Sequence, residues 1–371
     1  MRALVTGAYG FIGKHLVQAL RASGAHVDCF GSGDGQAALT AYCRKADVVF
    51  HLAGINRASD AALLQGNVAA AEQLTEALTQ AGNPCPVIVT SSVQASLQGR
   101  YDNAYGRGKR QSEQIFLRYG EQSGAEVTVL RLPGVFGKWC RPNYNSVVAT
   151  FCHAIARGEP IAVCEEEREL ELLYIDDVID TLLLSASLTE KSGYAALPTP
   201  YRIRVGELAA RLESFYALQA SGVLPRLAPG SAEARLYATY LSYLPPEQLL
   251  LPLARHNDER GSFFELLRSD AGGQISVNVT LPRQTRGQHW HSSKWEIFFV
   301  VGGCGEIRLR RVGDREVVRF ALDAASPTAV RIPPGYVHAL VNTAENTALT
   351  TVIWASEYFD AARPDTYRED I

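Results

Sequence analysis

The stretch RALVTGAYGFIG, residues 2–13, decides the fold of the first part of the chain. Residues 2–6 are mostly apolar and predict a short buried strand, and the helical pattern that starts at Ile12 runs to about Ser23. The three glycines between them form a GxxGxxG turn. Such a turn lets the backbone approach a pyrophosphate, and the N-terminus of the helix supplies N–H donors to it. The stretch therefore predicts a dinucleotide-binding unit.

Predicted strands alternate with predicted helices along this part of the chain. The strands are 27–30, 47–52, 87–91 and 127–132, and the helices are 37–44, 67–80 and 105–120. This alternation indicates an α/β fold, a Rossmann-type doubly wound parallel sheet with helices on both faces.

The pattern changes near Leu244-Pro245-Pro246. Beyond it, short stretches of alternating apolar residues are separated by glycine and proline turns, which predicts an all-β barrel or sandwich. We therefore expect a nucleotide-binding domain over residues 1–243, a linker over 244–254 and a β domain over 255–371.

Composition excludes several classes of function. The 371 residues are 47% hydrophobic and 20% charged, with a net charge of −3, which is ordinary for a globular enzyme and argues against a broad nucleic-acid-binding face. No apolar run approaches the roughly 20 residues of a membrane span, and nothing near the first residue has the length of a signal peptide. The seven cysteines form no CxxC pair, so a disulfide framework is not expected. We expect a cytoplasmic enzyme.

Tyr105 and Lys109 are one helical turn apart and share a helix face. A tyrosine with a pKa of about 10 is a poor acid, but a neighbouring ammonium favours the phenolate and helps the residue exchange a proton with a carbonyl oxygen. The preceding strand ends in Thr90, Ser91 and Ser92, whose hydroxyls could bind that carbonyl. The alternative for this spacing alone is a solvated helix face, and the glycine loop argues against it.

A second group of residues has the spacing of a metal site. His289 and His291 lie on one face of a predicted strand, Glu296 follows, and His338 comes after a Pro-Pro-Gly turn. Three imidazoles and one carboxylate suit zinc, and also iron, nickel or manganese. The alternative is a set of packed or surface histidines.

Residues 1–243 resemble an extended short-chain dehydrogenase/reductase that acts on nucleotide sugars. The resemblance implies that Ser92, or with less support Ser91, acts with Tyr105 and Lys109 as the catalytic relay. It also implies contacts to the cofactor. The residues concerned are Gly7, Gly10, Phe11, Ile12, Gly13, Leu52, Ala53, Gly54, Tyr105 and Lys109. Basic residues near the substrate could bind the phosphates of a UDP-sugar, or could form surface salt bridges. They are Arg131, Lys138, Arg141 and Arg168.

Three departures from that family are visible. The end of the second strand, near Gly31-Ser32, has no carboxylate for a ribose 2′-hydroxyl, which favours NADPH over NADH. The stretch from Gly31 to Asp47 is too short for the usual next strand. Gly134 replaces an asparagine expected near the substrate diphosphate.

Residues 255–371 resemble the cupin barrels, on the HxH(x)4E and PxG(x)2H patterns that contain the four predicted metal ligands. A reductase followed by a cupin resembles the bifunctional capsular and O-antigen polysaccharide enzymes of the CapF/WbjC family. Further support comes from the stretches GKWCRPNYNS, residues 137–146, and YLSYLP, residues 240–245.

This resemblance implies a homodimer that acts on a UDP-linked 4-keto-6-deoxy-N-acetylhexosamine. The cupin would epimerise C3 and the reductase would then reduce the C4 ketone with NADPH, giving UDP-2-acetamido-2,6-dideoxy-L-talose, a precursor of UDP-N-acetyl-L-fucosamine. Lys294, Glu306 and Tyr336 are possible acid or base groups in the barrel, or residues that only pack there. Two other interpretations stay open. One is a reductase whose cupin is a structural or dimerisation module, and the other is a non-catalytic protein that binds nucleotide sugars.

Overall fold

The computed structural model describes residues 1–96, 103–187 and 192–371, and the chain divides into two compact units. Unit 1 consists of Met1–Glu213 and Pro229–Pro245, and unit 2 of Ser214–Ala228 and Pro246–Ile371. The boundary between Pro245 and Pro246 falls inside residues 244–254, the linker expected from the sequence. Residues 214–228 group with unit 2, although the sequence pattern placed them in the first domain.

Unit 1 is built on a parallel sheet with the strand order β2-β1-β3-β4-β5-β8. The strands are β1 (Arg2–Thr6), β2 (His26–Phe30), β3 (Val48–His51), β4 (Val87–Ser92), β5 (Val127–Leu132) and β8 (Gly193–Tyr194). The parallel order confirms the Rossmann-type sheet. In the described part of the chain no strand pairs with the outer edge of β2, in agreement with the short stretch that follows it.

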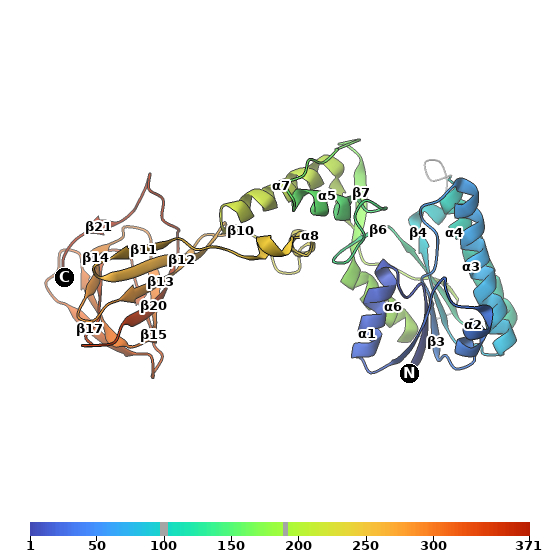
Figure 1. The fold of residues 1–371 in the computed structure, drawn as a ribbon, viewed down its shortest axis with the longest axis horizontal. Helices are drawn as coiled ribbons and strands as arrows, with labels where there is room; N and C mark the ends of the chain where they lie inside the picture. Colours follow the sequence, from blue (N-terminus) through green and yellow to red (C-terminus); the bar gives the residue numbers. More distant parts are fainter. Residues whose placement is uncertain (97–102, 188–191) are drawn as a thin grey trace. The chain divides into compact units, whose positions relative to one another are not determined.

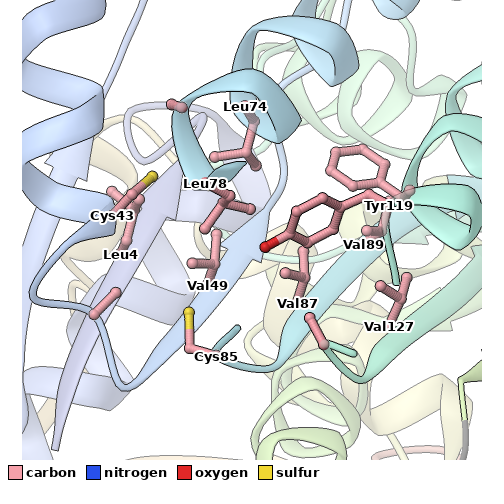
Figure 2. Close-up of a cluster of buried hydrophobic side chains, with 14 of the residues drawn as sticks. Leu4, Cys43, Val49, Leu74, Leu78, Cys85, Val87, Val89, Tyr119 and Val127 are labelled. Carbon is pink, nitrogen blue, oxygen red and sulfur yellow. The ribbon is translucent and has the colours of Figure 1, made fainter. Parts of the chain in front are cut away.

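Helices cover both faces of this sheet (Figure 1). They are α1 (Phe11–Ala22), α2 (Gln36–Cys43), α3 (Asp60–Ala81), α4 (Ala104–Ser123) and α6 (Ile175–Ser187). On one face, Leu78 of α3 and Tyr119 of α4 pack near Val49 of β3 (Figure 2). On the other face, α1 and α6 pack against the sheet. Leu4 and Val5 belong to different cores because successive strand side chains point to opposite faces.

The rest of unit 1 forms a smaller layer. Its sheet has the order β6-β7-β9, in which β6 and β7 are parallel and β9 is antiparallel. The elements are β6 (Gly134–Phe136), β7 (Glu169–Tyr174), β9 (Tyr201–Arg204), α5 (Val147–Ile155), α8 (Ala232–Leu241), and α7 (Val205–Ala220), which begins in unit 1 and ends in unit 2. Among the described residues, the 3₁₀ helix η1 (Val93–Ala95) lies in unit 1 and η3 (Pro246–Leu249) lies in unit 2.

Unit 2 consists of two sheets that are antiparallel except where β10 joins β12. The larger sheet contains β10 (Val223–Leu224), β11 (Arg255–Asp258), β12 (Gly261–Ser269), β13 (Gln274–Thr280), β20 (Leu349–Ala355), β15 (Glu296–Gly302) and β18 (Ala329–Ile332). The smaller one contains β17 (Val318–Asp323), β16 (Cys304–Arg311), β19 (Tyr336–Val341), β14 (Thr285–Trp290) and β21 (Tyr367–Arg368). Side chains of both sheets, among them Phe298, Ile307 and Leu340, share one apolar core. Unit 2 is thus the predicted β domain.

Among the described helices, none combines the length and the apolar character that a membrane crossing requires.

Candidate active sites

The glycine loop of unit 1 is shaped by close backbone contacts. Gly7 has φ +70°, and a Cβ there would lie 2.7 Å from the backbone nitrogen of Ala53. A Cβ on Gly13 would lie 2.2 Å from the carbonyl oxygen of Gly7. Gly10 caps α1 without a side-chain hydrogen bond, and the first turn of that helix contains no acidic residue. Its free N–H groups and the positive end of its dipole therefore suit a pyrophosphate.

The loop brings the other predicted cofactor contacts together. Phe11 and Ile12 are the first residues of α1, and residues 52–54 follow β3 directly against Gly7. A Cβ on Gly54 would lie 2.9 Å from Lys109 Nζ, so this glycine leaves room for the lysine. For residues 52–54, a role beside the cofactor is what the resemblance to a short-chain dehydrogenase/reductase implies, and it stays a prediction.

Ser92, at the end of β4, lies beside Tyr105, near the start of α4, and their hydroxyl groups interact. Burial raises the pKa of Tyr105, and the hydroxyl of Ser92 acts in the opposite direction. The hydroxyl of Ser91 is buried and has no hydrogen-bond partner among the described residues. The two groups that the sequence pairs, Ser92 and Tyr105, are therefore in contact.

Lys109 is 8% exposed, and its Nζ donates to the carbonyl oxygen of Thr90 at 3.2 Å. Burial lowers the pKa of Lys109 to about 8, while the charge of Glu113 opposes that shift. Its neighbour His51 is also buried, and burial and Lys109 lower the pKa of His51 to about 3, so this imidazole is neutral. Lys109 consequently presents the one positive charge of this buried pair.

Arg131 has a partner that the sequence did not reveal. Its guanidinium donates to both carboxylate oxygens of Glu113, with N–O distances of 2.9, 3.2 and 2.6 Å. The side chain of Glu113 is 1% exposed. The ring of Tyr194 lies 4.2 Å from the guanidinium, and its hydroxyl donates to Glu113 at 3.1 Å. Arg131 is thus the counter-ion of a buried carboxylate rather than a free cation.

The other three predicted phosphate ligands, Lys138, Arg141 and Arg168, are not part of this ion pair and have solvent-exposed side chains. Lys138 pairs with Asp176 at 3.1 Å, and Arg168 pairs with Glu165 at 3.3 Å. Arg141 is exposed, with its guanidinium 5.3 Å from the ring centre of Tyr144.

A carboxylate lies at the end of β2, although residues 31–33, which follow the strand directly, contain no acid. Asp34 folds back, and its Oδ2 accepts the N–H of Gly31 at 2.8 Å. The sequence pattern did not reveal this contact, because Asp34 lies four residues beyond the end of β2 at Phe30. A Gly-Ser-Gly-Asp turn is the local signal that could have revealed it.

The four predicted metal ligands converge in unit 2. The donor atoms of His289, His291, Glu296 and His338 all lie within 4.8 Å of one another. His289 faces His338 across the β14–β19 pair, and a bulge in β14 precedes it. Glu296 begins β15 on the other sheet. The two sheets therefore supply the two sides of one cluster.

The donor atoms of this cluster fit a metal ion. His291 Nε2, His338 Nε2 and Glu296 Oε2 are buried and have no hydrogen-bond partner among the described residues. His291 Nδ1 faces the carbonyl oxygen of Asp365 at 2.5 Å, so Nδ1 carries the proton and Nε2 offers its lone pair to the cluster. Burial alone would raise the pKa of Glu296, yet the adjacent imidazoles hold it well below its usual range. Burial and the other two imidazoles lower the pKa of His289 to about 4.

Comparison with known proteins agrees with both units. Residues 3–194 match the NAD dependent epimerase/dehydratase family, and residues 256–367 match the polysaccharide biosynthesis C-terminal domain. The class is thus an epimerase/dehydratase-type nucleotide-binding domain joined to a polysaccharide-biosynthesis domain. The chain belongs to the CapF/WbjC family of capsular and O-antigen enzymes, as its sequence predicts.

Two relatives carry this assignment. The chain is 38% identical over 371 residues to UDP-2-acetamido-2,6-beta-L-arabino-hexul-4-ose reductase of Pseudomonas aeruginosa, over 99% of this chain and 98% of the relative. It is 36% identical to the capsular polysaccharide assembling protein CapF from Staphylococcus aureus, with a TM-score of 0.89 over 100% of both chains. UDP-glucuronic acid 4-epimerase from Bacillus cereus, at 19% identity and a TM-score of 0.56 over 67% of this chain and all of its own, shows the shared fold alone.

Proposed function

We propose that the chain is a bifunctional UDP-sugar enzyme. Unit 2, a metal-bearing cupin, epimerises C3 of a UDP-4-keto-6-deoxy-N-acetylhexosamine, and unit 1 then reduces the C4 ketone with NADPH. The product is UDP-2-acetamido-2,6-dideoxy-L-talose, on the path to UDP-N-acetyl-L-fucosamine. The name of the Pseudomonas relative, a reductase of a UDP-linked 4-ulose, supports this substrate. The observation that carries the proposal is the presence, in two separate units, of an interacting Ser92–Tyr105 pair and a buried His/Glu cluster.

Reduction requires a hydride at C4 and a proton at O4 of the sugar. NADPH, when bound, would supply the hydride. Tyr105 gives its hydroxyl proton to the oxygen, Ser92 hydrogen-bonds that oxygen, and solvent returns a proton to the Tyr105 phenolate. Lys109 lies beside Gly54 and would hold the nicotinamide ribose.

Inversion at C3 uses the same ketone, because it acidifies the neighbouring C3–H. Loss of that proton gives an enolate, and its return on the opposite face inverts the carbon. A divalent ion such as Zn²⁺, held by the four ligands, would supply positive charge near the developing oxyanion. Of the three possible acid or base groups, Lys294 is 7% exposed, Tyr336 is half-buried, and Glu306 is ion-paired with Arg308 and Arg319.

The decisive test follows deuterium at C3. The wild type is incubated with the UDP-4-keto sugar in D₂O, with and without NADPH, beside the variants His289→Ala and His256→Ala. We expect exchange without NADPH in the wild type and in His256→Ala, whose histidine is exposed on β11 of the same unit. His289→Ala should lose both exchange and NADPH consumption, since epimerisation comes first.

Other outcomes separate the alternatives. NADPH consumption without any exchange in the wild type would mean that unit 2 is a structural or dimerisation module. Failure to bind NADPH or NADH would leave a nucleotide-sugar-binding protein without reductase activity.

The choice between NADPH and NADH depends on Asp34. Residues 30–32 contain no acid, which favours NADPH, but the Asp34 carboxylate on the Gly31 N–H opposes a 2′-phosphate at the end of β2. We therefore expect Asp34→Asn to raise the ratio of kcat/KM for NADPH to that for NADH about ten-fold. Asp180→Asn, at an exposed position on α6, is the control. An unchanged ratio in Asp34→Asn would show that the carboxylate lies away from the bound ribose.

A homodimer is the proposed assembly. In β15, Phe298 and Val300 point into the core, whereas Phe299 and Val301 are 38% and 56% exposed on the outer face of the sheet, with Trp295 41% exposed beside them. An apolar sheet face of this kind suits a second copy of the same chain. A sedimentation mass equal to one 40.4 kDa chain would contradict it.

A further inference from the structure

Asp365 holds the turn that connects two of the proposed metal ligands. Its carboxylate accepts the N–H groups of Ser292 at 2.8 Å, Ser293 at 3.0 Å and Lys294 at 2.9 Å. It also accepts the hydroxyl of Ser293 at 3.0 Å. This turn runs from His291 to Glu296, so a single carboxylate fixes the backbone path between an imidazole ligand and the carboxylate ligand. Three successive N–H groups that point at one anion form a nest.

The same residue also fixes the ring of a ligand. The backbone carbonyl of Asp365 lies 2.5 Å from His291 Nδ1. A carbonyl oxygen can only accept, so this contact selects the tautomer with Nε2 free and sets the rotation of the imidazole. The side chain and the main chain of one residue therefore contact His291 and the three residues that follow it.

The chain segment that contains Asp365 is held in place by contacts that do not involve its carboxylate. Tyr367 and Arg368 form β21, which pairs with Trp290 and His289 of β14. The rings of Tyr367 and Trp290 stack with their centres 4.5 Å apart. The segment should therefore remain in place when the carboxylate is removed, and the loss should fall on the turn 292–294.

We propose that Asp365 is a positioning residue for the metal site, which holds His291 and Glu296 in ligand geometry through the turn 292–294. The inference rests on the proposed metal site of unit 2. Partners of this kind around metal ligands typically change metal affinity by about 10–100-fold. The motif that contains His289, His291 and Glu296 does not reveal Asp365, because Asp365 follows Glu296 by 69 residues in the sequence.

The test measures metal binding by the full chain rather than catalysis. Protein stripped of metal with a chelator is titrated with Co²⁺, whose visible absorption reports ligand geometry, and with Zn²⁺ in competition with a chromophoric chelator. We expect Asp365→Ala to bind both ions about 10–100-fold more weakly and to alter the Co²⁺ spectrum. Asp365→Asn, which keeps one acceptor oxygen for the turn, should recover part of the affinity.

Asp323→Ala is the matched control. Its carboxylate accepts the N–H of Ala325 at 2.8 Å, in a different turn of unit 2. We expect its metal affinity to equal that of the wild type. Melting of the metal-free proteins completes the comparison, because a positioning role predicts similar melting temperatures without metal and a smaller metal-induced rise for Asp365→Ala.

Affinity of Asp365→Ala and Asp365→Asn within two-fold of the wild type would overturn the proposal, as would a drop in metal-free melting with unchanged affinity. A wild type that binds neither ion would instead contradict the metal site itself, and Asp365 with it. The two failures are thus distinguishable. Should Asp365→Ala not fold, Asp365→Asn alone decides, since a reduced affinity supports the role and an unchanged one overturns it.

Discussion

Tyr105→Phe should reduce NADPH-dependent reduction by about 10²–10⁴-fold, because the substitution removes the hydroxyl that gives its proton to the ketone oxygen. The phenyl ring keeps the packing of this half-buried side chain, so folding should be unaffected. The Ser92 hydroxyl loses its interaction with Tyr105 but stays at the end of β4. The effect should therefore appear in kcat rather than in the affinity for NADPH.

The measurement follows NADPH oxidation and C3 deuterium exchange in the same sample. Exchange should survive Tyr105→Phe, because unit 2 contains none of the relay. Tyr216→Phe, at an exposed position on α7, serves as the control. Residual reduction within ten-fold of the wild type would exclude Tyr105 as the proton donor, and loss of exchange would show that the two activities share a residue.

The elements that the sequence predicted well are governed by local rules. The glycine loop is a contiguous turn between a strand and a helix, and the pair Tyr105 and Lys109 depends on one helical turn. The HxH(x)4E pattern places His289, His291 and Glu296 within eight consecutive residues, and His338 belongs to the second motif, PxG(x)2H. For the contiguous groups, spacing along the chain implies proximity in the fold, whereas His338 was placed by the resemblance to cupins.

The parts that the sequence did not predict depend on register between distant segments. Glu113, Arg131 and Tyr194 come from α4, β5 and β8, and only the alignment of these elements brings the three together. Asp365 lies against the turn 292–294 because β21, which follows it, pairs with β14. A single charged residue has no periodic pattern, so its role is visible only in three dimensions. The sequence alone therefore left open whether Arg131 binds a phosphate or forms a salt bridge.

The Glu113–Arg131 pair leads to the largest expected change in stability. In Arg131→Ala, a carboxylate that is 1% exposed loses its counter-ion and keeps only the hydroxyl of Tyr194 as a donor in this cluster. Removing one partner of a buried pair costs about 3–5 kcal/mol, because an uncompensated charge remains away from water. Arg131→Lys should be intermediate, since an ammonium cannot reproduce the two-pronged contact.

Hydrogen exchange of peptides from α4 and β5 measures this effect within unit 1. We expect exchange in Arg131→Ala to accelerate by at least about 10²-fold. Arg202→Ala breaks an exposed pair with Glu171 and should cost less than about 1 kcal/mol. The double variant Glu113→Leu/Arg131→Met should regain stability, because it removes both charges of the pair together. If Arg131 instead binds the UDP diphosphate, Arg131→Ala would raise KM for the sugar and leave exchange in α4 and β5 unchanged.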